Sequence, residues 1–409
     1  MKHATGSRGR GVLHTPYDTT LRSTRDAHMD FELSESQKHW HDAAVAFAKQ
    51  ELDDDVAARD DRREFWREGY LRCARFGLCG LPVPKEHGGR GLGLPETIAA
   101  MEGLGYGCAD NGLIFAINAA LWTVTVPLVK HGTDEQKRRF LPGLCDGSIL
   151  GANAASEVDA GSDIFSMKST ARRAGDGWVL NGRKTWCTSA PVADLFSVYA
   201  SSDPDRGAMG ITAFLIPAST PGLRIVREIP KMGLRTVPMG EVALEDCSVP
   251  DSLRLGREGR GVEVFSGSME WERGAILASA LGTMRRQLER CVAHARSREQ
   301  FGQKIGKFQS VSNRVVDMAV RLETCRPLVH KIGWLKSLGR DATSEAAMAK
   351  LHVSECFVQN SLDAVRIFGA SGYACEDGIE RDLRDSVGSL IFSGTNDVQR
   401  MILARRMGL

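Results

Sequence analysis

The sequence lacks the short motifs that mark several common kinds of site. No Gly-x-Gly-x-x-Gly follows a strand-like run to open a helix, and no Gly-x-x-x-x-Gly-Lys-Ser/Thr occurs, so neither a Rossmann nucleotide site nor a P-loop is expected. The sequence also has no nucleophile elbow and no pattern that suggests a Ser-His-Asp triad. These absences argue against the commonest nucleotide-binding and serine-hydrolase sites.

Cysteine and histidine do not occur at metal-binding spacing. The ten cysteines stand singly, with no Cys-x-x-Cys pair, so neither a zinc site nor a redox pair is suggested. Among the ten histidines the closest spacing is His39-Trp40-His41, which is more typical of a solvated helix than of a metal site. We therefore expect no metal site, and we expect reduced thiols in a cytoplasmic protein.

Neither charge nor hydropathy points to a nucleic acid or a membrane as partner. Lys and Arg total 53 against 51 Asp and Glu, and a net charge of +2 gives no reason to expect the clustered basic face that binds nucleic acid. No apolar run reaches the roughly 18 residues that a membrane span needs. The most apolar stretch, residues 113–129, is interrupted by Asn118 and by small residues, which predicts a buried helix.

The first part of the 409-residue chain divides into two regions of different composition. Residues 1–28 are basic and rich in Ser, Thr and Gly, and we predict a disordered extension before a functional start near Met29. Residues 29–149 form a predicted N-terminal helical domain, because apolar residues recur at helical spacing. Its helices are expected at residues 32–53, 63–76, 95–104, from Asp110 onward, and at 137–144.

The remainder of the chain changes from β-like to helical patterns. Residues 150–256 contain short β-like runs, including a predicted hairpin that turns at Asn181-Gly182, the dipeptide that a type I′ turn favours. From residue 257 to 409 the pattern is that of long helices, whose length suits a bundle. These helices are expected at residues 262–297, 306–337, 344–368 and 396–406. The predicted fold is mainly α with a central β domain.

Five polar or glycine-rich segments lie where these regions join or where long helices end. They span residues 155–163, 184–189, 298–309, 366–373 and 392–397. Small residues in the first allow backbone N–H groups to approach a ligand, Trp186 and Thr188 share one face of a strand, and the last ends at a helix start that attracts anions. Taken singly, each segment is explained as well by an acidic turn, a core tryptophan, surface charge or a helix-ending turn.

Together, the order and spacing of these segments resemble the acyl-CoA dehydrogenase family over nearly the whole chain, from about Asp30 to the C-terminus. The match also includes the loop at residues 77–89 and the segment at residues 242–250. The resemblance implies FAD as the cofactor and a homotetramer that holds it at a subunit interface. It also implies an N-terminal helical domain, a small β-barrel-like domain and a C-terminal four-helix bundle.

The resemblance assigns two groups of residues to FAD. The first group would line the flavin ring, and consists of Ser156, Ser162, Trp186, Cys187 and Thr188. The second group would hold the phosphates and the adenosine, partly from a neighbouring subunit, and consists of Arg298, Phe301, Gln309, Arg366, Phe368, Gly369, Thr395 and Asp397.

The family reaction needs a base for the α proton, hydrogen bonds for an enolate-like oxygen, and flavin N5 as the hydride acceptor. Many members carry the base directly before Gly-Thr, where this chain has Ser393, and a serine hydroxyl alone is a poor proton acceptor. Other members carry it on the first bundle helix, directly before an arginine, where this chain has Glu272 and Arg273. Glu272 is therefore the predicted base. Glu270 is the second candidate, about 200° away around the helix.

The remaining assignments concern the substrate. The backbone N–H of Ser393 is expected to bind the thioester carbonyl, with Arg273 and Gly394 also at the substrate. The segments 271–273 and 392–395 resemble most the subgroup that dehydrogenates acyl or prolyl groups on carrier proteins in natural-product (antibiotic) biosynthesis.

Two other functions stay open at this point: an ordinary short- or branched-chain acyl-CoA dehydrogenase, and a non-catalytic FAD-binding relative. The acyl group, the choice between CoA and a carrier protein, and the electron acceptor, an electron-transfer flavoprotein or oxygen, are also open.

Overall fold

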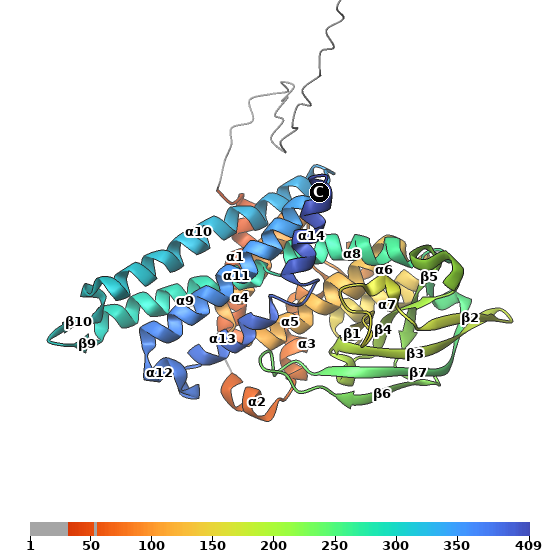
Figure 1. The fold of residues 1–409 in the computed structure, drawn as a ribbon, viewed down its shortest axis with the longest axis horizontal. Coiled ribbons are helices and arrows are strands. Elements are labelled where there is room, and N and C mark those ends of the chain that lie inside the picture. The colour runs from red at the N-terminus through yellow and green to blue at the C-terminus, as the bar shows by residue number, and fades with distance from the viewer. Residues whose placement is uncertain (1–31, 53–54) are drawn as a thin grey trace, which may run out of the picture. The chain divides into compact units, whose positions relative to one another are not determined.

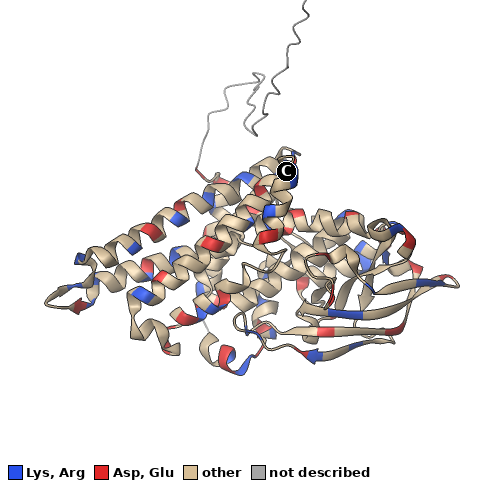
Figure 2. Cartoon of the chain, viewed as in Figure 1, with Lys and Arg blue, Asp and Glu red and all other residues tan. Residues whose placement is uncertain are grey.

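The computed structural model describes residues 32–52 and 55–409, and the predicted extension at residues 1–28 lies outside them. Within residues 34–409, long helices occupy one end and a single large sheet the other, with the N-terminal helices between them (Figure 1). Acidic and basic residues are interspersed along these helices and strands (Figure 2), in keeping with the nearly balanced charge of the sequence.

The N-terminal region is helical, as the sequence predicts. Its helices are α1 (Glu35–Glu51), α2 (Val56–Arg62), α3 (Arg67–Phe76), α4 (Leu94–Gly107), α5 (Asn111–Ala120), α6 (Val126–His131) and α7 (Asp134–Asp146). Helix α1 begins at a capping box, in which the Ser34 hydroxyl accepts from the Gln37 N–H and the Gln37 side chain accepts from the Ser34 N–H. The sequence pattern misses α2, a seven-residue helix capped by Asp55.

The apolar stretch at residues 113–129 is a core helix. Asp110 accepts from the Leu113 N–H at the start of α5, which continues through a π-helical turn (Leu121–Thr125) into α6. Residues 111–131 are apolar enough to cross a membrane, but 83% of the most apolar window is buried inside the protein. The side chain of Asn118 is satisfied within this core, because its oxygen accepts from the Trp122 indole at 2.8 Å.

The central region is one eight-stranded sheet with the order β6-β7-β3-β2-β4-β5-β8, and β1 pairs with β4 in parallel. The strands are β1 (Gly151–Ala154), β2 (Thr170–Ala174), β3 (Gly177–Thr188), β4 (Leu195–Ser201), β5 (Ile211–Pro217), β6 (Leu223–Glu228), β7 (Met239–Pro250) and β8 (Arg254–Leu255). The boundary drawn at residues 149/150 falls between α7 and β1, and the one at 256/257 falls between β8 and the next helix.

The predicted turn at Asn181-Gly182 is wrong. Strand β3 runs straight through these residues, and the hairpin turns earlier, where Ala174 of β2 pairs with Gly177 of β3. Asn181 and Gly182 instead stand at a bulge against β7, where the Asn181 side chain bonds the N–H and the carboxylate of Asp246. Position 182 needs glycine because a Cβ there would clash with Ser169.

The C-terminal region is the predicted helical bundle, with two differences from the expected elements. Its helices are α8 (Gly261–Ala275), α9 (Ala278–Ser297), α10 (Gln309–Ser337), α11 (Thr343–Phe368), α12 (Ala370–Tyr373), α13 (Ile379–Gly388) and α14 (Asn396–Arg406), with a small hairpin of β9 (Glu299–Gln300) and β10 (Gln303–Lys304). The helix expected at 262–297 is two helices that break at Ile276 and Leu277, where neither Gly nor Pro marks the break. Helices α12 and α13 and the β9–β10 hairpin were not expected.

The two helical regions share one hydrophobic core. Ile98 and Met101 of α4 belong to the same buried cluster as Leu281 and Met284 of α9. Helices α4 and α9 pack backbone to backbone, because a Cβ at Gly105 or Gly282 would meet the main chain of the other helix. A second cluster joins the sheet to α6 and α7. This packing places α8 between the bundle and the sheet (Figure 1).

Candidate active site

Glu272 and Ser393 meet although 121 residues separate them in the sequence. Glu272 lies near the end of α8 and is buried, with 6% of its surface exposed. The hydroxyl of Ser393 donates a hydrogen bond to Oε1 of Glu272 at 2.6 Å. The other oxygen, Oε2, is also buried and has no hydrogen-bond partner among the residues that the structure describes. One carboxylate oxygen is therefore held and the other is free for a ligand.

The surroundings of Glu272 tune its proton affinity in opposite directions. Burial raises the pKa of Glu272, while the Ser393 hydrogen bond and the charges of Arg273 and Lys350 lower it. Lys350 of α11 is fully buried and donates to the Asn396 side chain at 2.8 Å. Burial and the charge of Arg273 lower the pKa of Lys350 to about 7, against the opposing effect of Glu272. A carboxylate whose pKa is raised by burial is suited to act as a general base.

The loop that carries Ser393 is held by hydrogen bonds to its carbonyl groups. Ser393 has a left-handed backbone with φ of 58°, and Gly394 follows with φ of 86°. Arg273 Nε donates to the Ser393 carbonyl at 3.1 Å, and Gln399 Nε2 donates to the Gly394 carbonyl at 2.8 Å. Within the described chain, the Ser393 N–H donates to no protein acceptor. Thr395 caps α14 by accepting from the Val398 N–H.

Glu270 is oriented differently from Glu272. It forms an ion pair with Lys336 of α10 and accepts from the Ala342 N–H at 3.4 Å. Glu272 instead accepts from Ser393, and no ion pair joins it to Lys336 in the described chain. The geometry therefore favours Glu272 over Glu270 as the residue at the Ser393 loop.

The residues predicted at the flavin ring lie at the C-terminal end of β3 and in the loop beside it. The carbonyl of Ser156 accepts from the Thr185 N–H at 2.9 Å, which places the 155–163 loop beside the strand. Trp186 has a left-handed backbone, with φ of 57°, and exposes 54% of its surface, so a broad aromatic surface is free. Thr188 is half-buried. Cys187 is buried in the sheet, so only its backbone can reach a ligand.

A buried ion pair fixes the 155–163 loop. Glu157 accepts from Lys184 Nζ at 2.8 Å and from the N–H groups of Lys168 and Ser169 at 2.7 and 3.0 Å. Lys184 is fully buried beneath the loop. Ser162 lies in the exposed part of the same loop. The acidic turn that the sequence shows is therefore anchored through Glu157, which points inward.

Most residues predicted at the FAD phosphates and adenosine lie at the far end of the bundle. The β9–β10 hairpin and the end of α11 are at the opposite end from β3 (Figure 1). Phe301 exposes 93% of its surface there, and Phe368 stacks on His294 with the ring centroids 4.2 Å apart. The other predicted residues at this end, all exposed, are Arg298, Gln309, Arg366 and Gly369. Thr395 and Asp397 lie with Ser393 instead. Within one chain, the residues predicted at the flavin ring and most of those predicted at the phosphates and adenosine therefore lie far apart.

Comparison with protein families covers nearly all of the described chain. The N-terminal, middle and C-terminal domain models of the acyl-CoA dehydrogenases match residues 34–148, 152–247 and 259–408. The chain belongs to the acyl-CoA dehydrogenase family. This membership confirms the expected fold and identifies the protein as an FAD-dependent oxidoreductase that acts on a CH–CH bond.

Several relatives of this acyl-CoA dehydrogenase family member carry specific names. An L-prolyl-[peptidyl-carrier protein] dehydrogenase of Serratia sp. is 42% identical over 93% of this chain and 99% of its own length. One with the same name from Pseudomonas fluorescens is 43% identical over 93% of this chain and all of its own. Among solved structures, the prolyl acyl carrier protein oxidase AnaB is 45% identical with a TM-score of 0.91, over 92% of this chain and all of AnaB.

A further solved structure, described as PigA with FAD and proline, has a TM-score of 0.91 and is 42% identical. It covers 93% of this chain and the whole of the PigA chain. The predicted subgroup is therefore the one that the similar proteins represent.

Sequence reasoning missed several residues of the site in this acyl-CoA dehydrogenase family member. Lys350 was overlooked because it lies within a long predicted helix. Its neighbours Ala, Met and Leu could have indicated that this lysine is buried. Asn396 and Gln399 follow the predicted Thr395 and hold the loop, as described above for Gln399. The pair of Glu157 and Lys184 joins two of the predicted segments, and only the strand geometry reveals it.

Proposed function

We propose that this enzyme dehydrogenates an L-prolyl group that is bound as a thioester to a peptidyl carrier protein, in natural-product biosynthesis. The observation that carries the proposal is the contact of 2.6 Å between Glu272 and Ser393, which puts the only buried acid of α8 at the position of the usual family base. Relatives and solved structures named for prolyl carrier-protein substrates align with the chain over almost their whole length.

Glu272 acts as the base in this proposal. Its Oε1 is held by Ser393, so Oε2, which lacks a partner in the described chain, takes the α proton of the prolyl thioester. The bound FAD supplies the acceptor for the β hydrogen, which leaves with two electrons. The Cα–H and Cβ–H bonds break and a Cα–Cβ double bond forms, so atoms and electrons balance.

The loop at residues 393–395 stabilises the negative charge that develops on the thioester oxygen. The N–H of Ser393 is the donor, because it has no acceptor in the described chain, and Arg273 holds the loop through the Ser393 carbonyl. The half-buried Arg273, and the buried Lys350 when it is protonated, add a positive field beside this loop, where limited solvent makes such a field act more strongly.

We further propose that the FAD site is shared between subunits of a homotetramer. The support is the separation of the two FAD groups in one chain, together with the exposed aromatic side chains Phe301 and Tyr373 at the bundle end. We place the enzyme in the cytoplasm, in line with its ten free cysteines, of which nine are buried. An electron acceptor, a flavoprotein or oxygen, would then reoxidise the cofactor.

The test is anaerobic bleaching of the flavin absorbance in the purified FAD-loaded protein. The panel consists of L-prolyl carrier protein, other aminoacyl carrier proteins, L-prolyl-CoA and short and branched acyl-CoAs. Fast bleaching by L-prolyl carrier protein, and much slower bleaching by the others, is the expected result. Equal or faster bleaching by an acyl-CoA would contradict the carrier-protein substrate, and bleaching by no thioester would contradict catalysis altogether.

A further inference from the structure

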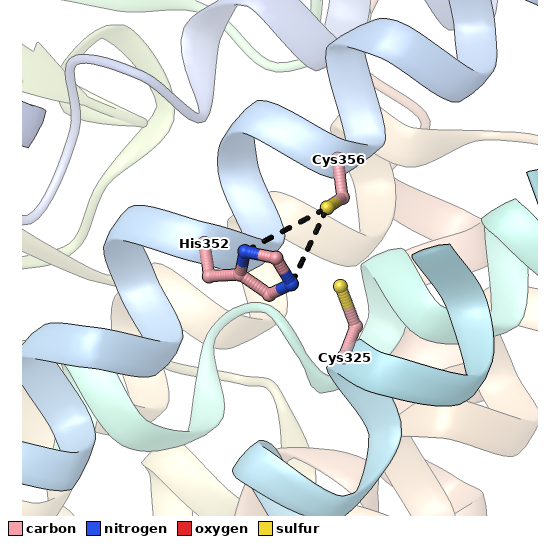
Figure 3. Close-up of side chains that lie close together, drawn as sticks. All are labelled: Cys325, His352 and Cys356. Carbon is pink, nitrogen blue, oxygen red and sulfur yellow. Dashed lines mark hydrogen bonds between the residues drawn. The ribbon is translucent and has the colours of Figure 1, made fainter. Parts of the chain in front are cut away.

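Two neighbouring helices of the bundle bring together three metal-binding side chains that the proposed reaction does not use. His352 and Cys356 are four residues apart on α11 and therefore lie on one face of that helix. Cys325 comes from α10, which packs beside it. Figure 3 shows the two thiols and the imidazole pointing toward a common space. Their ligand atoms all lie within 4.8 Å of one another.

The spacing of these atoms fits a tetrahedral ion. A zinc ion with Zn–S and Zn–N bonds of about 2.3 and 2.0 Å holds its sulfur and nitrogen ligands roughly 3.5 Å apart. The distance from Cys356 Sγ to His352 Nε2 is 3.6 Å, and that to Nδ1 is 4.0 Å. Nε2 is therefore the ligand atom that a small adjustment of the ring would place in the coordination sphere.

A divalent ion bound here would replace the two thiol protons and balance the charge of both thiolates. Arg321, on the same helix as Cys325, is engaged by Asn360 and Asp363 at 3.0 and 2.8 Å instead.

We propose that Cys325, His352 and Cys356 bind one Zn²⁺ ion. Two thiolates and one imidazole are the donor set that zinc prefers. His352 is exposed while both cysteines are buried, so the fourth position faces the solvent side and takes a water molecule. The ion ties α10 to α11, the helix that also carries Lys350 two residues before His352, and thereby stabilises the wall of the proposed active site.

The test uses the FAD-loaded enzyme, purified with a reductant and stripped of metal by a chelator. Zn²⁺ alone is titrated against it in competition with a chromophoric chelator, and Co²⁺ is added separately as a spectroscopic probe. We expect one Zn²⁺ per chain, a higher midpoint of thermal unfolding with zinc, and the near-ultraviolet bands of cobalt–thiolate bonds.

Three single variants and one control locate the ion. Cys325→Ser, Cys356→Ser and His352→Gln should each weaken zinc binding by at least about tenfold, since even the loss of an outer partner of a metal ligand has an effect of that size. Cys291→Ser removes an equally buried thiol of the same bundle and should leave zinc binding unchanged. Flavin absorbance of each variant verifies that it is folded.

Two outcomes would overturn the proposal. The first is zinc binding by the parent enzyme that is no tighter than binding by the Cys325→Ser variant. The second is a Cys325–Cys356 disulfide, detected as the loss of two titratable thiols in air, combined with no effect of His352→Gln on zinc binding. A disulfide requires the two sulfurs only, whereas a zinc ion requires the imidazole as well.

Discussion

Glu270 and Glu272 are two residues apart on α8 and have different partners: Glu270 forms an ion pair with Lys336, and Glu272 accepts from Ser393. Two residues correspond to about 200° of rotation on a helix, so one carboxylate points to α10 and the other to the Ser393 loop. This orientation decides which of two adjacent acids can reach a substrate.

Glu272→Gln should keep bound FAD and lower the rate of flavin reduction by roughly 10²- to 10⁴-fold, which is the usual contribution of a general base. Glu270→Gln is the matched control, because it removes an acid of the same helix that is paired with Lys336. Stopped-flow reduction under anaerobic conditions measures both variants. If flavin reduction in the Glu272 variant kept most of the parent rate, Glu272 could not be the base.

Ser393→Gly should shift the acid limb of the pH–rate profile to higher pH. The substitution removes the hydroxyl that lowers the pKa of Glu272, and glycine accepts the left-handed backbone at this position without strain. Near neutral pH the reduction rate should fall by about tenfold, since a hydrogen bond to a charged group contributes about 1.5–3 kcal/mol. An unchanged profile would show that the hydrogen bond does not tune Glu272.

Lys350→Met should also move that acid limb to higher pH, because the lysine charge lowers the pKa of Glu272. It should change stability in a pH-dependent way as well. The pKa of Lys350 is lowered to about 7 in the folded protein, so between pH 7 and about 10 the unfolded chain binds more protons and parent stability rises with pH. The variant should lack this rise. Urea unfolding at several pH values measures it, with the exposed Lys331→Met as control.

Lys184→Met should destabilise the protein by about 3–5 kcal/mol, the usual effect of removing one partner of a buried ion pair. Glu157 would remain buried with only the N–H groups of Lys168 and Ser169, and the 155–163 loop should hold FAD less well. Arg224→Met breaks the exposed pair with Glu245 in the same sheet and should change stability by no more than about 1 kcal/mol. Equal effects of the two substitutions on unfolding would contradict this role of Lys184.

Much of the fold could be predicted from the sequence because its helices are long and regularly patterned. Helix α1 and the continuous helix from Asn111 to His131 were expected, since apolar residues at helical spacing and a long, mostly apolar stretch are local signals. The prediction of a turn at Asn181-Gly182 was wrong because the same dipeptide can also occupy a β-bulge. Only the register against β7 distinguishes the two structures. The break at Ile276 depends on tertiary packing and has no local signal.

The site was predictable only in part. Family resemblance led to Glu272 and Ser393, but the buried Lys350 and the contact between the 155–163 loop and β3 are long-range relationships that no spacing rule contains. The Cys325 cluster was missed for the same reason. A search for short cysteine spacing cannot pair residues that meet only when α10 and α11 pack together. The roles of the FAD residues stay predictions.

The contact between Ser393 and Glu272 also bears on how such enzymes diverge. Two places in the chain, one on a loop and one on a helix, bring their side chains to the same point. An ancestor can therefore acquire a second acid before it loses the first, without an intermediate that lacks a base. The location of the acid in the gene can therefore change between lineages while the direction from which the proton is removed stays the same.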